Sequence, residues 1–461
     1  MSQFVDTVES VDLGESLRLL VEKIESFKSG RSKANSINRI AIEINADISI
    51  IDILKTSKVG SKIYWSDRSG DFESAGLGEA LKLTAADYGD IEKIINQAVQ
   101  VVSGSDDGVR IFGGIRFPSA SKNGSSSDWK LFGAGRFVVP RIEIVRNGSH
   151  CELVCNMTES DFDRADSIFQ ELESYFEGQI PEETIKDEII SRIDLPAFDG
   201  WDNAVNSILS DFRNGEIEKI VLARQTTIQF KNECDAPSIL KKLSAATPAC
   251  YHFYFEPGKG TVFLGASPEQ LYSRRNREIT SEALAGTRPR GADQNTDQKL
   301  GQELLQSEKE LREHKYVVDN IKAAFSSVCE NYSVLNESAL LKLAQVQHLR
   351  TEFKGKLRPE IIDADIIQSL HPTSAVGGFP STTAQNRIAQ YEEFERGWYA
   401  GAVGWLSKDA AEMAVAIRSG LVNGRELKLH SGAGIISGST AQGEWEEIES
   451  KIASFLNAVS D

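Results

Sequence analysis

The sequence has few cysteines and no long apolar run. Its 461 residues include five cysteines, Cys151, Cys155, Cys234, Cys250 and Cys329, and no Cys-x-x-Cys pair, so neither a disulfide framework nor a zinc site follows from them. No stretch of about 18 apolar residues is present, so no membrane-spanning helix is expected. The N-terminal segment carries acids and lacks a lysine-flanked apolar core, so we expect no signal peptide. This pattern indicates reduced thiols in a cytoplasmic protein.

Basic residues are also scarce relative to acids. Lys and Arg number 51 against 68 Asp and Glu, which gives a formal net charge of −17. A broad nucleic-acid surface needs a basic excess, so we expect no nucleic-acid partner. An anionic ligand would need a local basic pocket or a metal ion. The composition is otherwise that of a globular protein, with 40% hydrophobic and 26% charged residues.

Three short turn sequences predict antiparallel strand pairing. Each joins two alternating or apolar segments, and Asn-Gly in such a place is a strong hairpin signal. Because helical segments separate these hairpins, we predict an α+β fold, a large layered antiparallel β-sheet with helices packed on its faces. The turns are Asn147-Gly148 between 137–145 and 150–156, Pro257–Gly260 between 250–255 and 261–265, and Asn423-Gly424 between 413–421 and 426–436.

Apolar periodicity predicts further elements. A polar loop is predicted at 119–127. The segment Asp194–Asp199 interrupts the helical pattern, so we divide the chain into an N-terminal part (residues 1–195) and a C-terminal part (residues 196–461) of the same large fold. Helices are expected at 11–29, 91–102, 160–193 and 303–329, and strands at 39–44, 61–67, 112–117 and 132–145.

Two predicted helices carry carboxylates at helical spacing. Near the C-terminus, Glu444, Glu447 and Lys451 share one helix face. Upstream, Glu310 and Glu313 lie three residues apart, about 60° around a helix. Two facing Glu-x-x-Glu pairs have the oxygen ligands that Mg²⁺ prefers. The alternative is a solvated, salt-bridged helix surface.

Two residues are candidates for acid–base chemistry. Lys219 begins an apolar strand, where it either extends to the rim of the sheet or lies in a drier pocket and acts as a base. Glu269 follows a strand end and is either a surface carboxylate or a buried acid whose pKa is raised. We expect Lys219 and Glu269 to lie on paired strands and to act on one substrate.

Other segments offer groups that bind anions. Arg418 lies in an apolar strand, and its guanidinium matches the geometry of a carboxylate. Gly432-Ala433-Gly434 follows a strand, and such small residues let backbone N–H groups approach an anion. The same tripeptide is equally compatible with a bulge in a hairpin.

Eight ordered motifs within about 197–461 resemble those of the chorismate-utilising enzymes. Each motif alone is weakly specific, but their joint order is specific. Residues 1–195 carry only a loose likeness. The motifs are Lys219-Ile-Val-Leu-Ala-Arg224, Gly265-Ala-Ser-Pro-Glu269, Ala283-Leu-Ala-Gly-Thr287, Ser307-Glu-Lys-Glu-Leu-Arg-Glu-His314, His371-Pro-Thr-Ser-Ala375, Ala416-Ile-Arg-Ser419, Gly432-Ala-Gly-Ile435 and Glu444-x-x-Glu447-x-x-x-Lys451.

The resemblance implies the chorismate-binding enzyme fold, chorismate as substrate and Mg²⁺ as cofactor. It implies that Lys219 activates the nucleophile and that Glu269 protonates the departing C4 hydroxyl. The Mg²⁺ ligands that it implies are Glu310, Glu313, Glu444 and Glu447. The substrate-binding positions that it implies are Gly286, Thr287, His348, Ala375, Arg418, Gly432, Ala433, Gly434 and Lys451.

Residue types within the family favour water as the nucleophile. Anthranilate synthases typically have glutamine at the position of Lys219, and aminodeoxychorismate synthases commonly carry a nucleophilic lysine at the position of Ala285. Both ammonia users and their glutaminase subunit are therefore disfavoured, and the chain looks most like an isochorismate synthase. Salicylate synthases, which also eliminate pyruvate but tend to have threonine at Ala375, are the alternative. A non-catalytic binding module is disfavoured because Lys219 and Glu269 are both present.

Overall fold

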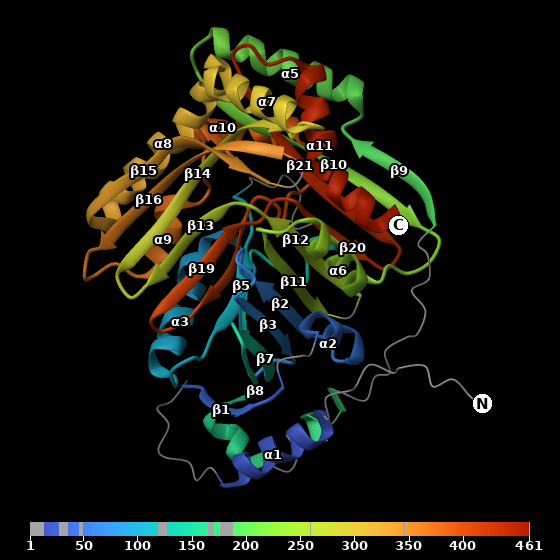
Figure 1. Ribbon diagram of the computed structural model, residues 1–461, viewed down its shortest axis with the longest axis vertical. Coiled ribbons are helices and arrows are strands. Elements are labelled where there is room, and N and C mark those ends of the chain that lie inside the picture. The colour runs from blue at the N-terminus through green and yellow to red at the C-terminus, as the bar shows by residue number, and fades with distance from the viewer. Residues whose placement is uncertain are drawn as a thin grey trace.

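The fold consists of two large antiparallel sheets with helices on their outer faces (Figure 1). The computed structural model describes residues 13–26, 36–45, 49–118, 127–164, 170–172, 174–175, 188–258, 260–343 and 346–460. The predicted loop at 119–127 lies almost entirely outside the described residues. The predicted α+β fold with a layered antiparallel sheet is confirmed.

The first sheet has 12 strands within the described residues. In spatial order they are β1 (Asn38–Glu43), β8 (His150–Met157), β7 (Ile142–Asn147), β3 (Phe72–Leu77), β2 (Lys62–Ser66), β11 (Tyr251–Gly258), β12 (Thr261–Ser267), β20 (Ser419–Asn423), β21 (Glu426–Ile436), β10 (Lys219–Phe230) and β17 (Gly378–Phe379). Strand β9 (Ile189–Leu195) pairs with the second half of β10. The three predicted hairpins are the pairs β7–β8, β11–β12 and β20–β21.

The second sheet has nine strands in the described part of the chain. They are, in order, β15 (Cys329–Lys342), β16 (Val346–Leu357), β14 (Glu278–Pro289), β13 (Gln270–Arg275), β19 (Ala410–Val415), β18 (Ala402–Leu406), β5 (Ile111–Ile115), β6 (Gly135–Val139) and β4 (Leu81–Ala85). Both sheets therefore contain strands from before and after residue 195. The division of the chain at 195/196 stays a prediction.

The helices surround these sheets. The α-helices are α1 (Leu13–Ser26), α2 (Ile50–Thr56), α3 (Ile91–Gly104), α5 (Phe198–Arg213), α6 (Ala236–Ala246), α7 (Gln294–Gln306), α8 (Glu308–Val328), α9 (Asp363–Leu370), α10 (Ser381–Tyr391) and α11 (Ala441–Ser460). Short 3-10 helices occupy Tyr88–Asp90, Ser127–Trp129 and Glu159–Arg164. None of the helices in the described ranges is long and apolar enough to cross a membrane. All five cysteines are described, and they form no disulfide bond.

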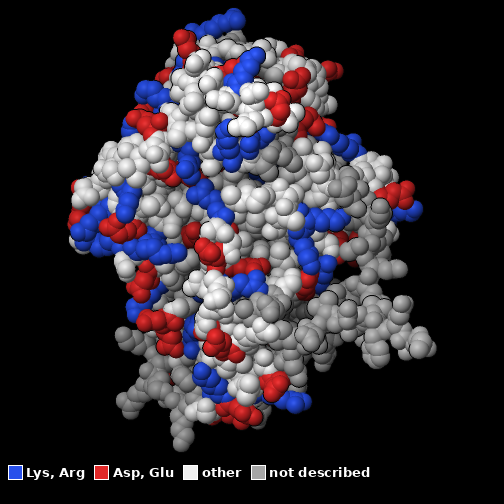
Figure 2. Space-filling model, viewed as in Figure 1, with Lys and Arg blue, Asp and Glu red and all other residues white. Residues whose placement is uncertain are grey.

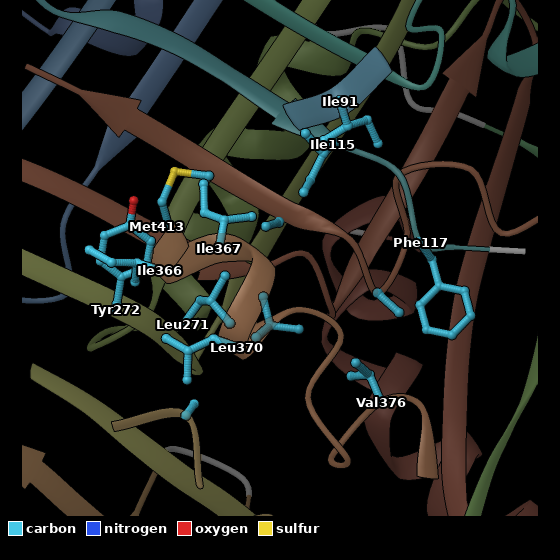
Figure 3. Packing of buried hydrophobic residues seen from close by; sticks show 14 of the residues in the cluster. Ile91, Ile115, Phe117, Leu271, Tyr272, Ile366, Ile367, Leu370, Val376 and Met413 are labelled. Atoms are coloured by element: carbon cyan, nitrogen blue, oxygen red, sulfur yellow. The ribbon is translucent and has the colours of Figure 1, made fainter. Parts of the chain in front are cut away.

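Apolar side chains form three layers of core. An aromatic layer fills the space between the sheets, with Trp65 and Phe263 from the first sheet and Phe112 and Trp405 from the second. The other face of the first sheet packs against α1, α2, α6 and α11. The other face of the second sheet packs against α3, α8 and α9, and Figure 3 shows residues of α9 beside Leu271 and Met413 of β13 and β19. This layering fixes α8 against β14 and α11 against β21.

The structure corrects four predicted elements. The segment 132–145 is not one strand, because it contains β6 and most of β7, which belong to different sheets. The segment 413–421 is not one strand, because β19 and β20 belong to different sheets. The predicted helix at 160–193 is wrong at both of its described ends. The first end is the 3-10 helix Glu159–Arg164, and the last end is strand β9. The predicted helix at 303–329 is two helices, because the Ser307 side chain accepts a hydrogen bond from the backbone N–H of Glu310 and so caps the start of α8.

Candidate active site

A cavity lies where both sheets meet α8 and α11. It contains about 670 Å³ of space not filled by atoms, part of it open to solvent. Strands β10, β14, β16 and β21 form its walls together with the segments around Glu269, Ala375 and Arg418. Eleven predicted site residues line it: Glu269, Gly286, Thr287, Glu313, His348, Ala375, Arg418, Gly432, Gly434, Glu447 and Lys451. Figure 2 shows how Lys and Arg side chains are interspersed with Asp and Glu on one face of the molecule, without a broad basic surface.

Lys219 begins β10 and is fully buried, with 0% of its surface exposed. Strand β10 runs between β21 and β17 at this point, so the side chain does not extend to the rim of the sheet. Its Nζ lies 3.0 Å from Glu313 Oε1 on α8. No aligned hydrogen bond satisfies this Nζ, which leaves hydrogen-bonding capacity for a ligand.

Glu269 lies between β12 and β13 and is 3% exposed. Burial, reinforced by the nearby Glu282 carboxylate, raises the pKa of Glu269 to about 8, against the opposing effects of Lys219 and Lys451. Of the two alternatives that the sequence left open for Glu269, the structure therefore favours the buried carboxyl group over the surface one, and its role as the acid stays a prediction. The predicted pairing of the two strands is wrong, because β20 and β21 stand between β12 and β10.

The four predicted Mg²⁺ ligands lie on α8 and α11, and a basic side chain accompanies each of them. Glu313 pairs with Lys219, as described above, and Glu310 pairs with Arg288 at 2.9 Å. On α11, Glu447 pairs with Lys451 at 2.6 Å, and Glu444 pairs with Lys309 at 2.7 Å. Glu313 and Glu447 face the cavity, whereas Glu310 and Glu444 lie behind its surface.

The carboxylates on α11 influence one another. Burial and the Glu447 charge raise the pKa of Glu444, and Lys309 opposes them. Burial also disfavours charge on Glu447, but Lys451 and Lys309 outweigh it and lower the pKa of that carboxyl. Within the described residues, no three His, Cys, Asp or Glu side chains are close enough together to hold a metal as they stand. The four carboxylates nevertheless have the chemistry that Mg²⁺ prefers.

Strand β21 presents two glycines to the cavity. The Gly432 carbonyl accepts a hydrogen bond from Lys451 Nζ at 2.9 Å, so the backbone N–H and C=O of Gly432 point away from β10. Because alternate residues of a strand point their backbone groups the same way, those of Gly434 also point away from β10. Ala433 does not line the cavity, because its backbone faces β10 and its side chain lies in the core. Gly434 has no room for a side chain, since a Cβ there would lie 2.2 Å from Glu313 Oε1.

His348 on β16 is a neutral hydrogen-bonding group. Burial, with the charges of Arg418 and Lys451, lowers its pKa to about 3. Its Nδ1 lies 3.1 Å from Thr287 Oγ1 and 3.3 Å from the Gly286 carbonyl. A carbonyl only accepts, so the contact with Gly286 places the proton on Nδ1. The buried Nε2, which has no hydrogen-bond partner among the described residues, is then free to accept a hydrogen bond.

Arg418 lines the cavity in a left-handed backbone conformation, with φ of 51°. Such a conformation costs a non-glycine residue about 1–3 kcal/mol, and a hydrogen bond from Ala266 N–H to the Arg418 carbonyl at 3.0 Å supports it. The guanidinium donates to the Lys451 carbonyl at 3.3 Å. Arg418 and Lys451 thus bring two positive groups to one side of the cavity.

Several residues around the cavity were not predicted from the sequence. Tyr399 and Ser431 line it, and Tyr399 is stacked on His430. Arg288 and Lys309 form the ion pairs with Glu310 and Glu444. Lys309 lies in the motif Ser307–His314, directly before Glu310. Its position next to a predicted Mg²⁺ ligand could have marked it as a residue near the site. For Tyr399 we find no such signal.

Comparisons with known proteins identify the family. The family model described as "Chorismate binding enzyme" matches residues 22–460. The chain is 32% identical to isochorismate synthase MenF of Bacillus subtilis, over 93% of this chain and 95% of that protein. It is 30% identical to isochorismate synthase MenF of Escherichia coli, over 87% and 88% of the two chains.

Solved structures agree as well. The menaquinone-specific isochorismate synthase MenF from Escherichia coli superposes with a TM-score of 0.83 at 27% identity, over 97% of this chain and 100% of that one. Anthranilate synthase component I from Streptococcus pneumoniae, at 20% identity and a TM-score of 0.66 over 93% and 94% of the chains, shares the fold. The protein therefore belongs to the chorismate binding enzymes.

Proposed function

We propose that this protein is an isochorismate synthase. It adds water at C2 of chorismate and releases the C4 hydroxyl as the ring double bonds shift, so that substrate and product are isomers. The isochorismate synthases that match over most of the chain support this assignment. The observation that carries it is that a buried glutamic acid, Glu269, lines the cavity, while a buried lysine, Lys219, lies directly behind the cavity wall, 3.0 Å from Glu313.

Lys219 is the proposed base. It takes a proton from the attacking water, and its contacts with Glu313 and with Gly434, which both line the cavity, hold it beside the cavity wall. Glu269 is the proposed acid. With a pKa of about 8 it keeps its proton at neutral pH and donates it to the departing hydroxyl.

The proposed carboxylate-binding groups are Arg418, Lys451 and the N–H groups of Gly432 and Gly434. A guanidinium, an ammonium and backbone N–H donors suit the two carboxylates of chorismate. His348, with a neutral ring and an unpartnered Nε2, is proposed to accept a hydrogen bond from a substrate hydroxyl. Thr287 and Gly286 hold that ring in place.

Mg²⁺ is the proposed cofactor. Glu310, Glu313, Glu444 and Glu447 would hold it, because they supply hard oxygen ligands from two helices beside the cavity. When bound, it would draw electron density from the ring carboxylate. The basic partners of these carboxylates keep the charges balanced until the metal binds.

Salicylate synthase is the second candidate, because it requires the same lysine. Ala375 and Ala285 both line the cavity, so two of the three positions that distinguish the family members touch the bound substrate in this proposal. Alanine offers no nucleophile at 285, which favours water and no glutaminase subunit. We also propose that the protein works in the cytoplasm, where its thiols stay reduced.

The test is to incubate the purified protein with chorismate and Mg²⁺ and identify the products by chromatography and mass. We expect isochorismate without added ammonia or glutamine. Salicylate with pyruvate as the main product would favour the second candidate. Anthranilate or aminodeoxychorismate as the main product would refute the assignment.

A further inference from the structure

An arginine from the N-terminal part reaches the segment that carries Glu269. Arg68, in the loop between β2 and β3, donates from Nη1 to the Pro268 carbonyl at 2.9 Å and to Glu282 Oε1 at 2.5 Å. The same Glu282 oxygen accepts a hydrogen bond from the backbone N–H of Gln270 at 3.0 Å. One ion pair therefore holds the residues on both sides of Glu269.

The surroundings fix this ion pair in place. The Arg68 guanidinium lies 5.1 Å from the centre of the Tyr251 ring, and the Tyr251 hydroxyl accepts a hydrogen bond from Gln270 Nε2 at 2.9 Å. Glu282 is 3% exposed. Arg350 lies farther from it, at 3.9 Å, so Arg68 is its closest positive partner. Removing one partner of a buried pair leaves an uncompensated charge.

We propose that Arg68 is a positioning residue for Glu269, and that with Glu282 it holds the segment Pro268–Gln270 so that the acid faces the cavity. This proposal rests on the proposed function. It gives the N-terminal part a role in the reaction, because Arg68 belongs to that part while Glu269 and Glu282 belong to the other.

Glu282 has a second effect, which is electrostatic. After burial, its charge is the largest influence that raises the pKa of Glu269, and Lys219 on β10 and Lys451 on α11 act against it. The other charged groups of the cavity wall are Glu313 on α8, Glu447 on α11 and Arg418 before β20. They are the same in all variants below, so replacing Glu282 changes one charge only.

The first experiment compares Arg68→Met with Arg68→Lys and with a matched control. Arg146→Met is the control, because the side chain of Arg146, on β7 next to β3, is also 23% exposed, pairs with Glu73 at 2.7 Å and lies outside the cavity lining. We expect Arg68→Met to lower kcat by about tenfold to a hundredfold, as for partial loss of an acid catalyst, with KM within threefold of wild type. Arg68→Lys should recover part of kcat, and Arg146→Met should keep it within twofold.

The second experiment uses Glu282→Gln, which keeps the hydrogen-bond acceptor for Gln270 but removes the charge. We expect the alkaline limb of its kcat–pH profile to move to lower pH, because the pKa of Glu269 falls when the neighbouring negative charge is lost. A role for Glu282 in folding alone would leave this limb in place. If Arg68→Met fails to fold, the shift of the alkaline limb in Glu282→Gln still tests the proposal.

The outcomes separate the two proposals. If wild type produces no isochorismate, the proposed function fails, whatever the variants do. If wild type is active but Arg68→Met keeps kcat within twofold, Arg68 does not position the acid. An unshifted alkaline limb for Glu282→Gln would likewise overturn the proposal.

Discussion

Replacing Glu269 by glutamine should make the protein more stable at alkaline pH. The carboxyl group is buried, and its pKa is raised from 4.5 to about 8. Above pH 8 the folded protein must therefore keep a charge in a site that disfavours it, whereas the unfolded chain carries the same charge in water. The amide of Glu269→Gln has nearly the same shape and never ionises.

The magnitude follows from the difference in pKa between the folded and unfolded states. The raised folded-state value means that the contribution of Glu269 to stability is most favourable below about pH 4.5 and is lost as the pH rises through about 8. The difference is 8 − 4.5, or about 3.5, and one pKa unit corresponds to about 1.36 kcal/mol. The full effect is therefore about 5 kcal/mol. Between pH 5 and pH 9 the variant should gain about 4 kcal/mol relative to wild type.

The assay is urea unfolding of both proteins in chelator-treated buffer at pH 5, 7 and 9, followed by tryptophan fluorescence. Glu446→Gln, at an exposed glutamate on α11, measures the effect of exchanging a carboxyl for an amide outside the cavity. We expect the difference between Glu269→Gln and wild type to grow with pH. A difference that stays constant within about 1 kcal/mol, far below the expected 4, would show that Glu269 does not titrate as a buried acid.

The remaining predictions concern the base and the metal. Lys219→Ala should lose about 10²–10⁴-fold in kcat while chorismate affinity, measured by calorimetry, stays near wild type; a loss below about tenfold would mean that another group activates water. Glu313→Gln and Glu447→Gln should need more Mg²⁺ for half-maximal activity, and unchanged Mg²⁺ dependence in both would contradict the ligand assignment. Lys309→Met should bind Mg²⁺ about tenfold more tightly, as for loss of a competing ion pair with Glu444 worth about 1.4 kcal/mol. Calorimetry with Mg²⁺ and substrate-free protein measures this, Lys309→Arg is the control, and equal affinities would refute it.

Local signals predicted the parts of the fold that depend on neighbours in sequence. Asn147-Gly148 predicted the β7–β8 hairpin, and apolar spacing predicted α11. The passage of the chain from β19 in one sheet to β20 in the other was not predictable in the same way. It occurs at Ala416–Arg418, where Arg418 adopts φ of 51° without a glycine or proline to signal a turn.

The site shows the same limit. Residue types and motifs identified Lys219 and Glu269, but the sequence left open whether either residue is buried. Burial was decided by β17 and β21 beside Lys219 and by the packing of both sheets around Glu269. Arg68 lies 200 residues before Pro268, and nothing in the spacing of a single arginine indicates so distant a contact.

The net charge of −17 does not oppose the binding of a dicarboxylate, because the charges at the cavity are locally balanced. Glu310, Glu313, Glu444 and Glu447 each have a basic partner within 3.0 Å. Glu269 adds no charge at neutral pH, since its pKa is about 8. Arg418 remains as a positive group on the cavity wall. A dianionic substrate and a divalent cation that bind together leave the net charge of this group unchanged, whereas either one alone changes it, so each should favour the binding of the other.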